Sequence, residues 1–233
     1  MLKTQPLHGL LTIKLAPDLA LPAALQASVD RVWEAAIVQN SQLFDGSIFT
    51  VVDYAGDRML LARGSYRHIV AARHDNAIKQ ALGLKPLAVS GILAGPGGFL
   101  FGRRARTVAQ GAGLWELAPS GAVDAGNGGA TPDLGDEILR ELREEIGLTQ
   151  DQVIVQPPVG IVEDSESGVV DIVLPLATGL SAAEIAAAHE TRGSDEYDAV
   201  HIAASPHDFV QARDDILPET RVIVDLFAQR WID

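Results

Sequence analysis

The sequence contains no cysteine. This absence excludes disulfide bonds, zinc sites built from thiolates and catalytic cysteine nucleophiles. Residues 1–26 lack the continuous apolar core and the cleavage site of a signal peptide. No apolar run reaches the ~20 residues that a membrane-spanning helix needs. We therefore expect a soluble cytoplasmic protein with no membrane as a partner.

Positive charge is also scarce. Lys and Arg together number 18 and Asp and Glu number 31, so the formal net charge is 18 − 31 = −13. A surface this acidic repels nucleic acid, which is therefore not expected as a partner. A small anionic substrate would need a local device such as a metal ion, an arginine pair or a helix N-terminus.

Several familiar motifs are missing. The zinc-protease pattern HEXXH, the Walker A loop and the GxGxxG dinucleotide fingerprint do not occur, and the six histidines show no ligand spacing. We see no internal repeat. These absences leave acidic side chains as the main candidates for metal binding and catalysis.

Strand-like and helix-like segments are mixed along the chain, which indicates a layered α/β fold. We expect a smaller α+β region at residues 1–85 and the main domain at residues 86–233, joined at the short link "GLKP". The predicted helices cover residues 22–39, 66–83, 132–146, 181–190, 205–215 and 218–231. The predicted strands lie within residues 8–15, 49–54, 57–64, 86–94, 98–105, 114–118, 152–162, 168–177 and 197–204.

The predicted helix at residues 132–146 has two distinct faces, because residues three and four apart share a side of a helix. Carboxylates stacked in this way repel each other, and a divalent cation between them removes the repulsion. An ordinary solvated acidic face is the alternative interpretation. The apolar face consists of Leu134, Ile138, Leu142 and Ile146, and the acidic face consists of Asp133, Glu137, Glu141 and Glu145 with Arg140 and Glu144 beside them.

The segment from Arg140 to Leu148, "RELREEIGL", resembles the second half of the Nudix box, G-x5-E-x7-R-E-U-x-E-E-x-G-U, where U is aliphatic. Every fixed position of that half matches. Upstream, "WELAPSGAVDAG" resembles the strand and turn that open the box, with Gly121 as its first glycine. The resemblance implies a Nudix α/β/α sandwich and Mg²⁺-dependent hydrolysis of a diphosphate bond in a nucleoside diphosphate derivative.

The loop of the box departs from the pattern. Six residues after Gly121 stands Asn127, and counting back from Arg140 places Pro132 at the position of the expected glutamate. The first glutamate of the box is therefore missing or displaced. The candidates to replace it are Asp124, Asp133 and Glu137.

The resemblance also implies roles for single residues. Glu141 and Glu145 would be catalytic and the principal ligands of Mg²⁺, for which Mn²⁺ is able to substitute. Glu144 would assist a further ion, and the Ser120 carbonyl would also reach metal. The residues that would be structural in the motif are Gly121, Arg140 and Gly147.

The substrate is suggested by a wider similarity. A helix that contains Trp33, the segments "LFDG", "LAVSGIL" and "GRRAR", and the lengthened loop are together similar to divergent animal Nudix enzymes that split UDP-glucose and UDP-galactose. This implies UMP and a sugar 1-phosphate as products. Arg103 and Arg104 are candidates for binding the diphosphate, because arginine binds phosphate oxygens in pairs. A basic edge strand is the alternative reading of these two residues.

Other functions stay open. One alternative substrate is ADP-ribose or another dinucleotide. In a further alternative, the chain is a catalytically weak Nudix-fold module that binds a nucleotide and has a regulatory role. A homodimer is also compatible with the sequence.

The general base is expected outside the box. In many relatives it is a carboxylate on a mobile loop before a late strand, a place that the segment at residues 189–202 fits. We choose Glu196 from the carboxylates Glu190, Asp195, Glu196 and Asp198, since it lies where the loop meets the strand. The alternatives are Glu141 as the base, or a solvated acidic loop with no catalytic role.

Overall fold

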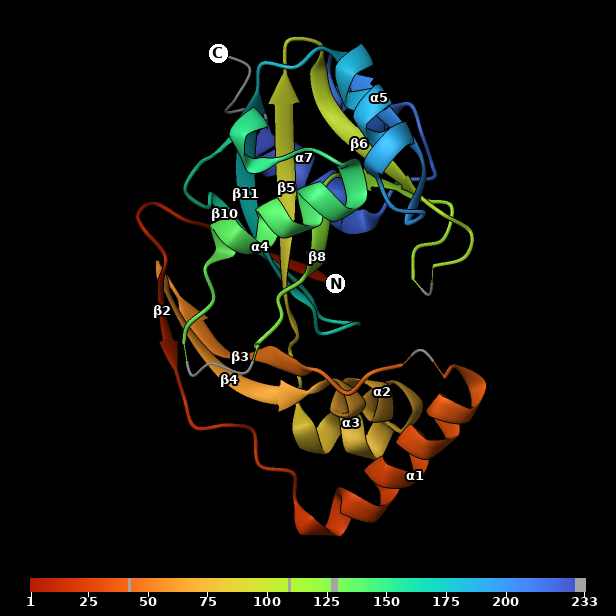
Figure 1. Ribbon diagram of the computed structural model, residues 1–233. Coiled ribbons are helices and arrows are strands. Elements are labelled where there is room, and N and C mark those ends of the chain that lie inside the picture. Colours follow the sequence, from red (N-terminus) through yellow and green to blue (C-terminus); the bar gives the residue numbers. More distant parts are fainter. Residues whose placement is uncertain (42, 109, 127–129, 229–233) are drawn as a thin grey trace.

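The computed structural model describes residues 1–41, 43–108, 110–126 and 130–228. The described strands form one large mixed sheet and one small sheet (Figure 1). No helix in the described ranges is long and apolar enough to cross a membrane.

The large sheet has the strand order β1-β10-β11-β5-β6-β12, with the short strands β7, β8 and β9 pairing to β6, β5 and β11. Its centre is the parallel pair of β5 and β11, and both strands are buried along most of their length because helices cover both faces. The strands are β1 (Leu2–Pro6), β5 (Leu87–Gly95), β6 (Gly98–Arg104), β7 (Trp115–Leu117), β8 (Ser120–Ala122), β9 (Val153–Val155), β10 (Gly160–Asp164), β11 (Val170–Thr178) and β12 (Tyr197–Ala203).

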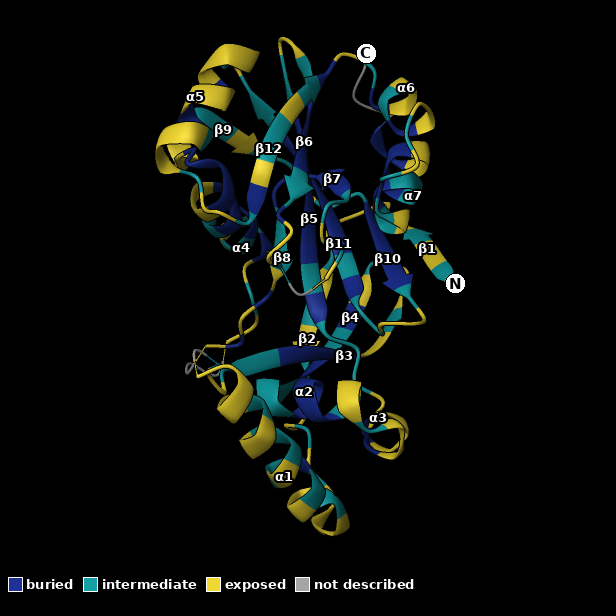
Figure 2. Ribbon diagram, turned by 90° about the vertical axis from the view of Figure 1, so that its right-hand side faces the viewer, coloured by how far each residue is buried: buried dark blue, intermediate teal, exposed yellow. Residues whose placement is uncertain are grey.

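Helices pack on the two faces of this sheet, as Figure 2 shows from the side. On one face Ile138, Leu142 and Ile146 join a core cluster with Val89 and Ile172. The other face holds a second cluster, formed with the last helix. The helices around this sheet are α4 (Leu134–Glu141), the π-helix η1 (Leu142–Ile146), the 3₁₀ helix η2 (Gln150–Gln152), α5 (Ala182–Arg192), α6 (Pro206–Gln211) and α7 (Pro218–Leu226).

The small sheet belongs to the N-terminal part of the chain. Its order is β2-β4-β3, and three helices pack beside it. A separate core cluster holds Val29, Ala71, Ile78 and Leu82. The elements are β2 (Thr12–Leu15), α1 (Ala23–Gln39), β3 (Ser47–Ala55), β4 (Arg58–Ser65), α2 (Tyr66–His74) and α3 (Asn76–Leu82).

These elements confirm the expected α/β class with a smaller N-terminal α+β region. The division between residues 85 and 86 stays a prediction. The first strand, β1, pairs with β10 in the large sheet although it precedes that division. The backbone of Ala125 also donates to Ser47 O at 3.1 Å, so the loop after β8 contacts the small sheet directly.

Several predicted helices differ at their boundaries, and the one expected over residues 205–215 ends already at Gln211. The helix expected over residues 66–83 is interrupted at Asp75, whose side chain accepts hydrogen bonds from Ala77 N and Ile78 N and begins a second helix. The helix expected from residue 132 begins at Leu134 instead, because Asp133 accepts from Gly135 N and Asp136 N as its N-cap. In both places a short acidic side chain sets the start of the helix.

Candidate active site

Two acidic side chains of the α4–η1 helix lie buried against β8. Glu141 is 8% exposed and Glu145 is 1% exposed. The apolar face of the same helix is also buried, in the core beneath it. The spacing of the sequence thus places both carboxylates at the edge of the core and not on a solvated face. The π-helical turn η1 begins directly after Glu141 and contains Glu145, and such turns occur often at functional sites.

The Glu145 carboxylate is only half satisfied. Its Oε2 accepts a hydrogen bond from Ser120 N at 3.0 Å, and its Oε1 is buried without a hydrogen-bond partner. Burial raises the pKa of Glu145 well above its usual value, and the nearby carboxylates of Glu116, Glu141 and Glu196 add to the effect. A buried carboxylate oxygen with no donor is costly, and a bound cation would remove that cost.

Glu141 lies between a glycine and an arginine. Its carboxylate packs against Gly121, where an added Cβ would overlap it. Its Oε1 accepts from an Arg140 Nη atom at 2.7 Å. Burial raises the pKa of Glu141 to about 7 even though the Arg140 charge lowers it. The glycine of the turn therefore makes room for one of the two predicted ligands.

Arg140 is bonded to a carboxylate that is able to replace the missing glutamate of the box. Its guanidinium donates to Glu137 Oε2 at 3.1 Å, to Glu144 Oε2 at 3.1 Å and to the Ala122 carbonyl at 3.2 Å. Asp133 caps the helix instead. Asp124 accepts from Gly126 N. Of these three candidates for the missing glutamate, Glu137 is the one bound to Arg140, and Asn127 lies outside the described residues.

The loop at residues 193–196 is tied to the acidic helix. Ser194 N donates to Glu144 O at 2.9 Å, and Arg192 Nε donates to Gly147 O at 2.9 Å. Gly147 has φ 76° and ends the helix, as the sequence predicts. These contacts bring Glu196 close enough for its charge to raise the pKa of both Glu141 and Glu145.

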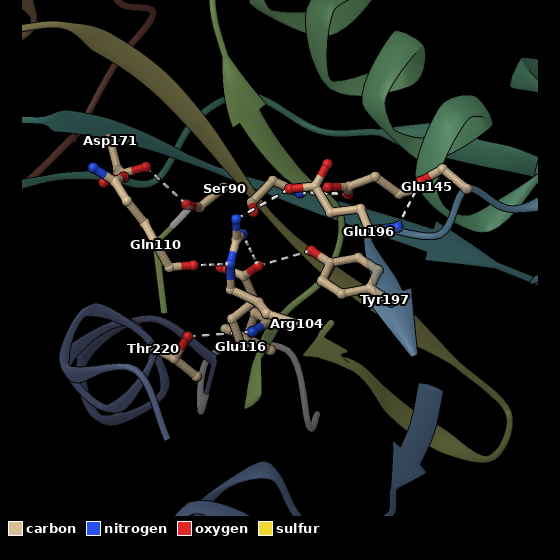
Figure 3. Close-up of polar contacts among 12 residues, drawn as sticks. Ser90, Arg104, Gln110, Glu116, Glu145, Asp171, Glu196, Tyr197 and Thr220 are labelled. Atoms are coloured by element: carbon tan, nitrogen blue, oxygen red, sulfur yellow. Dashed lines mark hydrogen bonds and ion pairs between the residues drawn. The ribbon is translucent and has the colours of Figure 1, made fainter. Parts of the chain in front are cut away.

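A partly buried network connects Glu196 with β6 and β7. Arg104 donates to Glu116 at 2.5 Å and to Glu196 at 3.1 Å, and the Tyr197 hydroxyl donates to Glu116 at 3.0 Å (Figure 3). Burial raises the pKa of Glu116, which Arg104 and Tyr197 oppose. Arg103 points elsewhere, pairing with Asp198 at 2.5 Å. Sequence reasoning missed Glu116, because a single acid between Trp115 and Leu117 carries no motif.

A cleft of about 410 Å³ opens beside this network. The large sheet, the start of α7 and the N-terminal region all contribute to its lining. Arg103 is not among the described residues that line it. The residues of the candidate site that line the cleft are Arg104, Glu116, Ser120, Gly121 and Glu196.

No model of a known protein family matches the chain, and no curated protein matches it. Among solved structures, the chain is similar to a MutT protein from Methanosarcina mazei Go1, with 20% identity, 62% of this chain and 94% of that chain covered, and a TM-score of 0.45. An Ap4A hydrolase from C. elegans has 17% identity, 62% and 96% coverage, and a TM-score of 0.41. A NUDIX hydrolase from Nitrosomonas europaea has 16% identity, 62% and 73% coverage, and a TM-score of 0.43. Similarities this low assign no activity to the chain.

The acidic residues fit a hard divalent cation in their chemistry. Mg²⁺ prefers carboxylate and carbonyl oxygens, and the unpartnered Glu145 Oε1 is such an atom. Within the described ranges, however, no three His, Cys, Asp or Glu side chains are already arranged to hold a metal ion. Glu141 is bound to Arg140 and Glu145 to Ser120 N, so metal binding requires these side chains to turn toward a common point.

Proposed function

We propose that the protein is a Nudix-type pyrophosphohydrolase that uses Mg²⁺, or Mn²⁺ in its place, to hydrolyse the diphosphate bond of a nucleoside diphosphate linked to a second moiety. The observation that carries this proposal is the buried, unpartnered Oε1 of Glu145 next to Glu141 and the Gly121 turn. Both acids belong to the segment that resembles the Nudix box. Arg140 pairs with Glu141, but the buried Glu145 has no cation bonded to it among the described residues, which is unfavourable and supports a metal-dependent role.

The residues that would hold the metal are Glu141 and Glu145, assisted by Glu144 and the Ser120 carbonyl. When bound, the ion neutralises the diphosphate and activates water. Arg140 holds Glu141 and Glu144 in place through its guanidinium. Gly121 leaves the space that the Glu141 carboxylate occupies, and Gly147 ends the helix after the last acid.

Glu196 is the proposed general base. It takes a proton from the attacking water, whose oxygen forms a bond to phosphorus while the bridging P–O bond breaks and its electrons go to the leaving phosphate. Arg104 donates to the Glu196 carboxylate, and Glu196 O accepts from Ala105 N at 2.7 Å, so the side chain and the backbone are both fixed. Glu190, Asp195 and Asp198 lack this combination of contacts among the described residues.

For the substrate we propose a UDP-sugar, which would give UMP and a sugar 1-phosphate. The similarity of the wider chain to UDP-glucose and UDP-galactose pyrophosphatases supports this choice. Arg104 lines the cleft and is better placed than Arg103 to approach a diphosphate, provided that it releases one of its two carboxylates. The net charge of −13 supports a small-molecule partner over nucleic acid.

The decisive experiment is a screen of UDP-sugars, ADP-ribose and dinucleotides with Mg²⁺ or Mn²⁺, with the monophosphate products measured. We expect UMP and glucose 1-phosphate from UDP-glucose. Glu145→Gln should lower turnover by at least about 100-fold because it removes a ligand charge without changing shape. Glu34→Gln, on the exposed side of α1, is the matched control and should leave turnover unchanged.

Each other outcome selects a different function. Cleavage of ADP-ribose without cleavage of UDP-glucose would refute the UDP-sugar substrate and keep the pyrophosphohydrolase. Binding of nucleotides with no cleavage would favour the regulatory module, which the missing loop glutamate also favours. Full Mg²⁺-dependent turnover by the Glu145→Gln variant would overturn the metal assignment.

A further inference from the structure

Asp171 and Ser90 form a polar pair on the floor of the cleft. They lie on the neighbouring parallel strands β11 and β5, and Ser90 Oγ donates to Asp171 Oδ1 at 3.0 Å. Both residues line the cleft of about 410 Å³. Their side chains share the face of the sheet with Val173 and Ile92, which pack with α7. The pair is therefore built into the rigid centre of the sheet.

The Asp171 carboxyl is poorly compensated. The bond from Ser90 is the one hydrogen bond to this carboxyl that the described residues supply. Burial raises its pKa to about 7, which Ser90 opposes, and the carboxylates of Glu219, Glu116 and Asp164 raise it further. The Asp171 carboxyl lines the cleft and is able to accept further hydrogen bonds. It therefore suits a ligand that donates hydrogen bonds.

The two ends of the cleft differ in the cations that are bonded to their acidic side chains. Figure 3 shows Arg104 and Glu196 between Glu145 on one side and Asp171 with Ser90 on the other. The proposed phosphate end lies at Arg104, Ser120 and Gly121, which line the cleft beside the acidic helix. Asp171 is instead close to further carboxylates, since the charges of Glu219, Glu116 and Asp164 raise its pKa.

At the other end Arg104 and the proposed metal ion would offset the carboxylates, whereas the described residues place no bonded Lys or Arg on Asp171. A phosphate group is therefore repelled at Asp171, and neutral hydroxyl groups donate to it. A carboxylate has two oxygens and accepts from two adjacent hydroxyls at once. An acidic residue is also the usual partner of ribose hydroxyls in dinucleotide sites, for this same reason. The chemistry of Asp171 and Ser90 matches a vicinal diol.

We propose that Asp171 and Ser90 form a subsite that binds vicinal hydroxyl groups of the substrate, from either the ribose or the attached sugar. Asp171 accepts from the hydroxyls, and Ser90 orients its carboxyl through their shared hydrogen bond. This inference rests on the proposed function for the identity of the substrate, although the subsite itself needs only the cleft and the pair.

The test compares UDP-glucose with two analogues, one that carries 2′-deoxyribose and one that carries 2-deoxyglucose. Affinity is measured by titration calorimetry with Ca²⁺ in place of Mg²⁺, and KM and kcat are measured with Mg²⁺. Wild-type protein should bind one of the two analogues about 10- to 100-fold more weakly than UDP-glucose. The analogue that loses affinity identifies the sugar that occupies the subsite.

The variant Asp171→Asn should bind UDP-glucose and that analogue equally, with KM raised about 10- to 100-fold and kcat within about threefold of wild type. Asparagine keeps the shape and still accepts from Ser90, and thermal unfolding checks that the variant folds. Asp225→Asn, on the exposed side of α7 outside the cleft lining, is the control and should behave as wild type.

The outcomes for the subsite and for the enzyme are separate. Unchanged discrimination and affinity in the folded Asp171→Asn variant would overturn the subsite, whether or not the protein is active. Absence of turnover with any nucleoside diphosphate derivative would overturn the proposed function, and the calorimetric comparison would still decide whether Asp171 binds the hydroxyls.

Discussion

The carboxylate of Glu141 occupies the space that a side chain at Gly121 would fill. Gly121 lies in β8 opposite Val89, and its φ is not in the left-handed region. The glycine is needed here for close approach and not for an unusual backbone conformation. The turn and the helix are thereby fitted to each other at the position of a proposed metal ligand.

Gly121→Ala should displace the Glu141 carboxylate and lower metal-dependent turnover by at least about 10-fold, because a misplaced catalytic group has large kinetic effects. The apparent affinity for Mg²⁺, measured from the metal dependence of turnover, should fall with it. Gly179→Ala is the control, since a Cβ there meets nothing within 4 Å. Equal turnover in the two variants would contradict the role given to this contact.

Arg104 and Arg103 are neighbours in sequence with different expected effects on stability. Arg104→Ala leaves the buried Glu116 without its cation and should lower the free energy of unfolding by about 3–5 kcal/mol. Arg103→Ala breaks a more exposed pair with Asp198 and should cost under about 1 kcal/mol. Urea unfolding at constant pH measures both changes.

The double variant Arg104→Ala/Glu116→Gln provides the control for this comparison. Removal of both charges should restore part of the stability that Arg104→Ala loses, because no uncompensated carboxylate remains. If the double variant is less stable than Arg104→Ala by the full cost of a separate Glu116→Gln substitution, the two side chains do not interact as the structure indicates.

Local patterns were sufficient to predict the acidic helix. The repeat of apolar residues at three and four positions predicts the buried face that contains Ile138 and Leu142, and the structure confirms it. The same repeat places Glu141 and Glu145 together. The central strands β5 and β11 were also predictable, since both are short apolar runs.

Contacts between distant segments were not predictable from local patterns. Tyr197 and Glu116 are 81 positions apart, and Arg104 and Glu196 are 92 positions apart. Their pairing depends on how β12, β6 and β7 are arranged in the sheet, which no single segment encodes. The sequence therefore offered Arg104 as a candidate for binding the diphosphate without indicating the two carboxylates that it pairs with in the structure.

Glu137 and Asp133 test how the missing loop glutamate is replaced. Glu137→Gln should weaken the ion pair that holds the Arg140 guanidinium. Because Arg140 also binds Glu141 and Glu144, both carboxylates should become less well positioned and turnover should fall by about 10-fold or more. Asp133→Asn should keep wild-type turnover, because asparagine caps a helix as well as aspartate does. Steady-state kinetics with saturating Mg²⁺ measure the two variants. The reverse order of effects would show that the cap residue, and not Glu137, supports the site.

Asp171 makes the stability of the metal-free protein depend on pH in a defined direction. The pKa of Asp171 is about 7 in the folded protein, against the usual value of 3.8 for an aspartate. Between these two pH values the folded protein holds a proton that the unfolded chain has released. The contribution of Asp171 to the free energy of unfolding is fully present below a pH of about 4. It is lost as the pH rises through about 7.

Asp171→Asn should remove that dependence. The variant should match wild type near pH 4 and be more stable above pH 7, by at most roughly 4 kcal/mol, because a pKa unit corresponds to about 1.4 kcal/mol. The observed gain should be smaller, since Asp171 is only partly buried and solvent in the cleft screens its charge. Urea unfolding in the presence of a chelator, from pH 4 to pH 8, measures the difference between the two proteins. A constant difference over this range would mean that the Asp171 carboxyl ionises in the folded protein as it does in the unfolded chain.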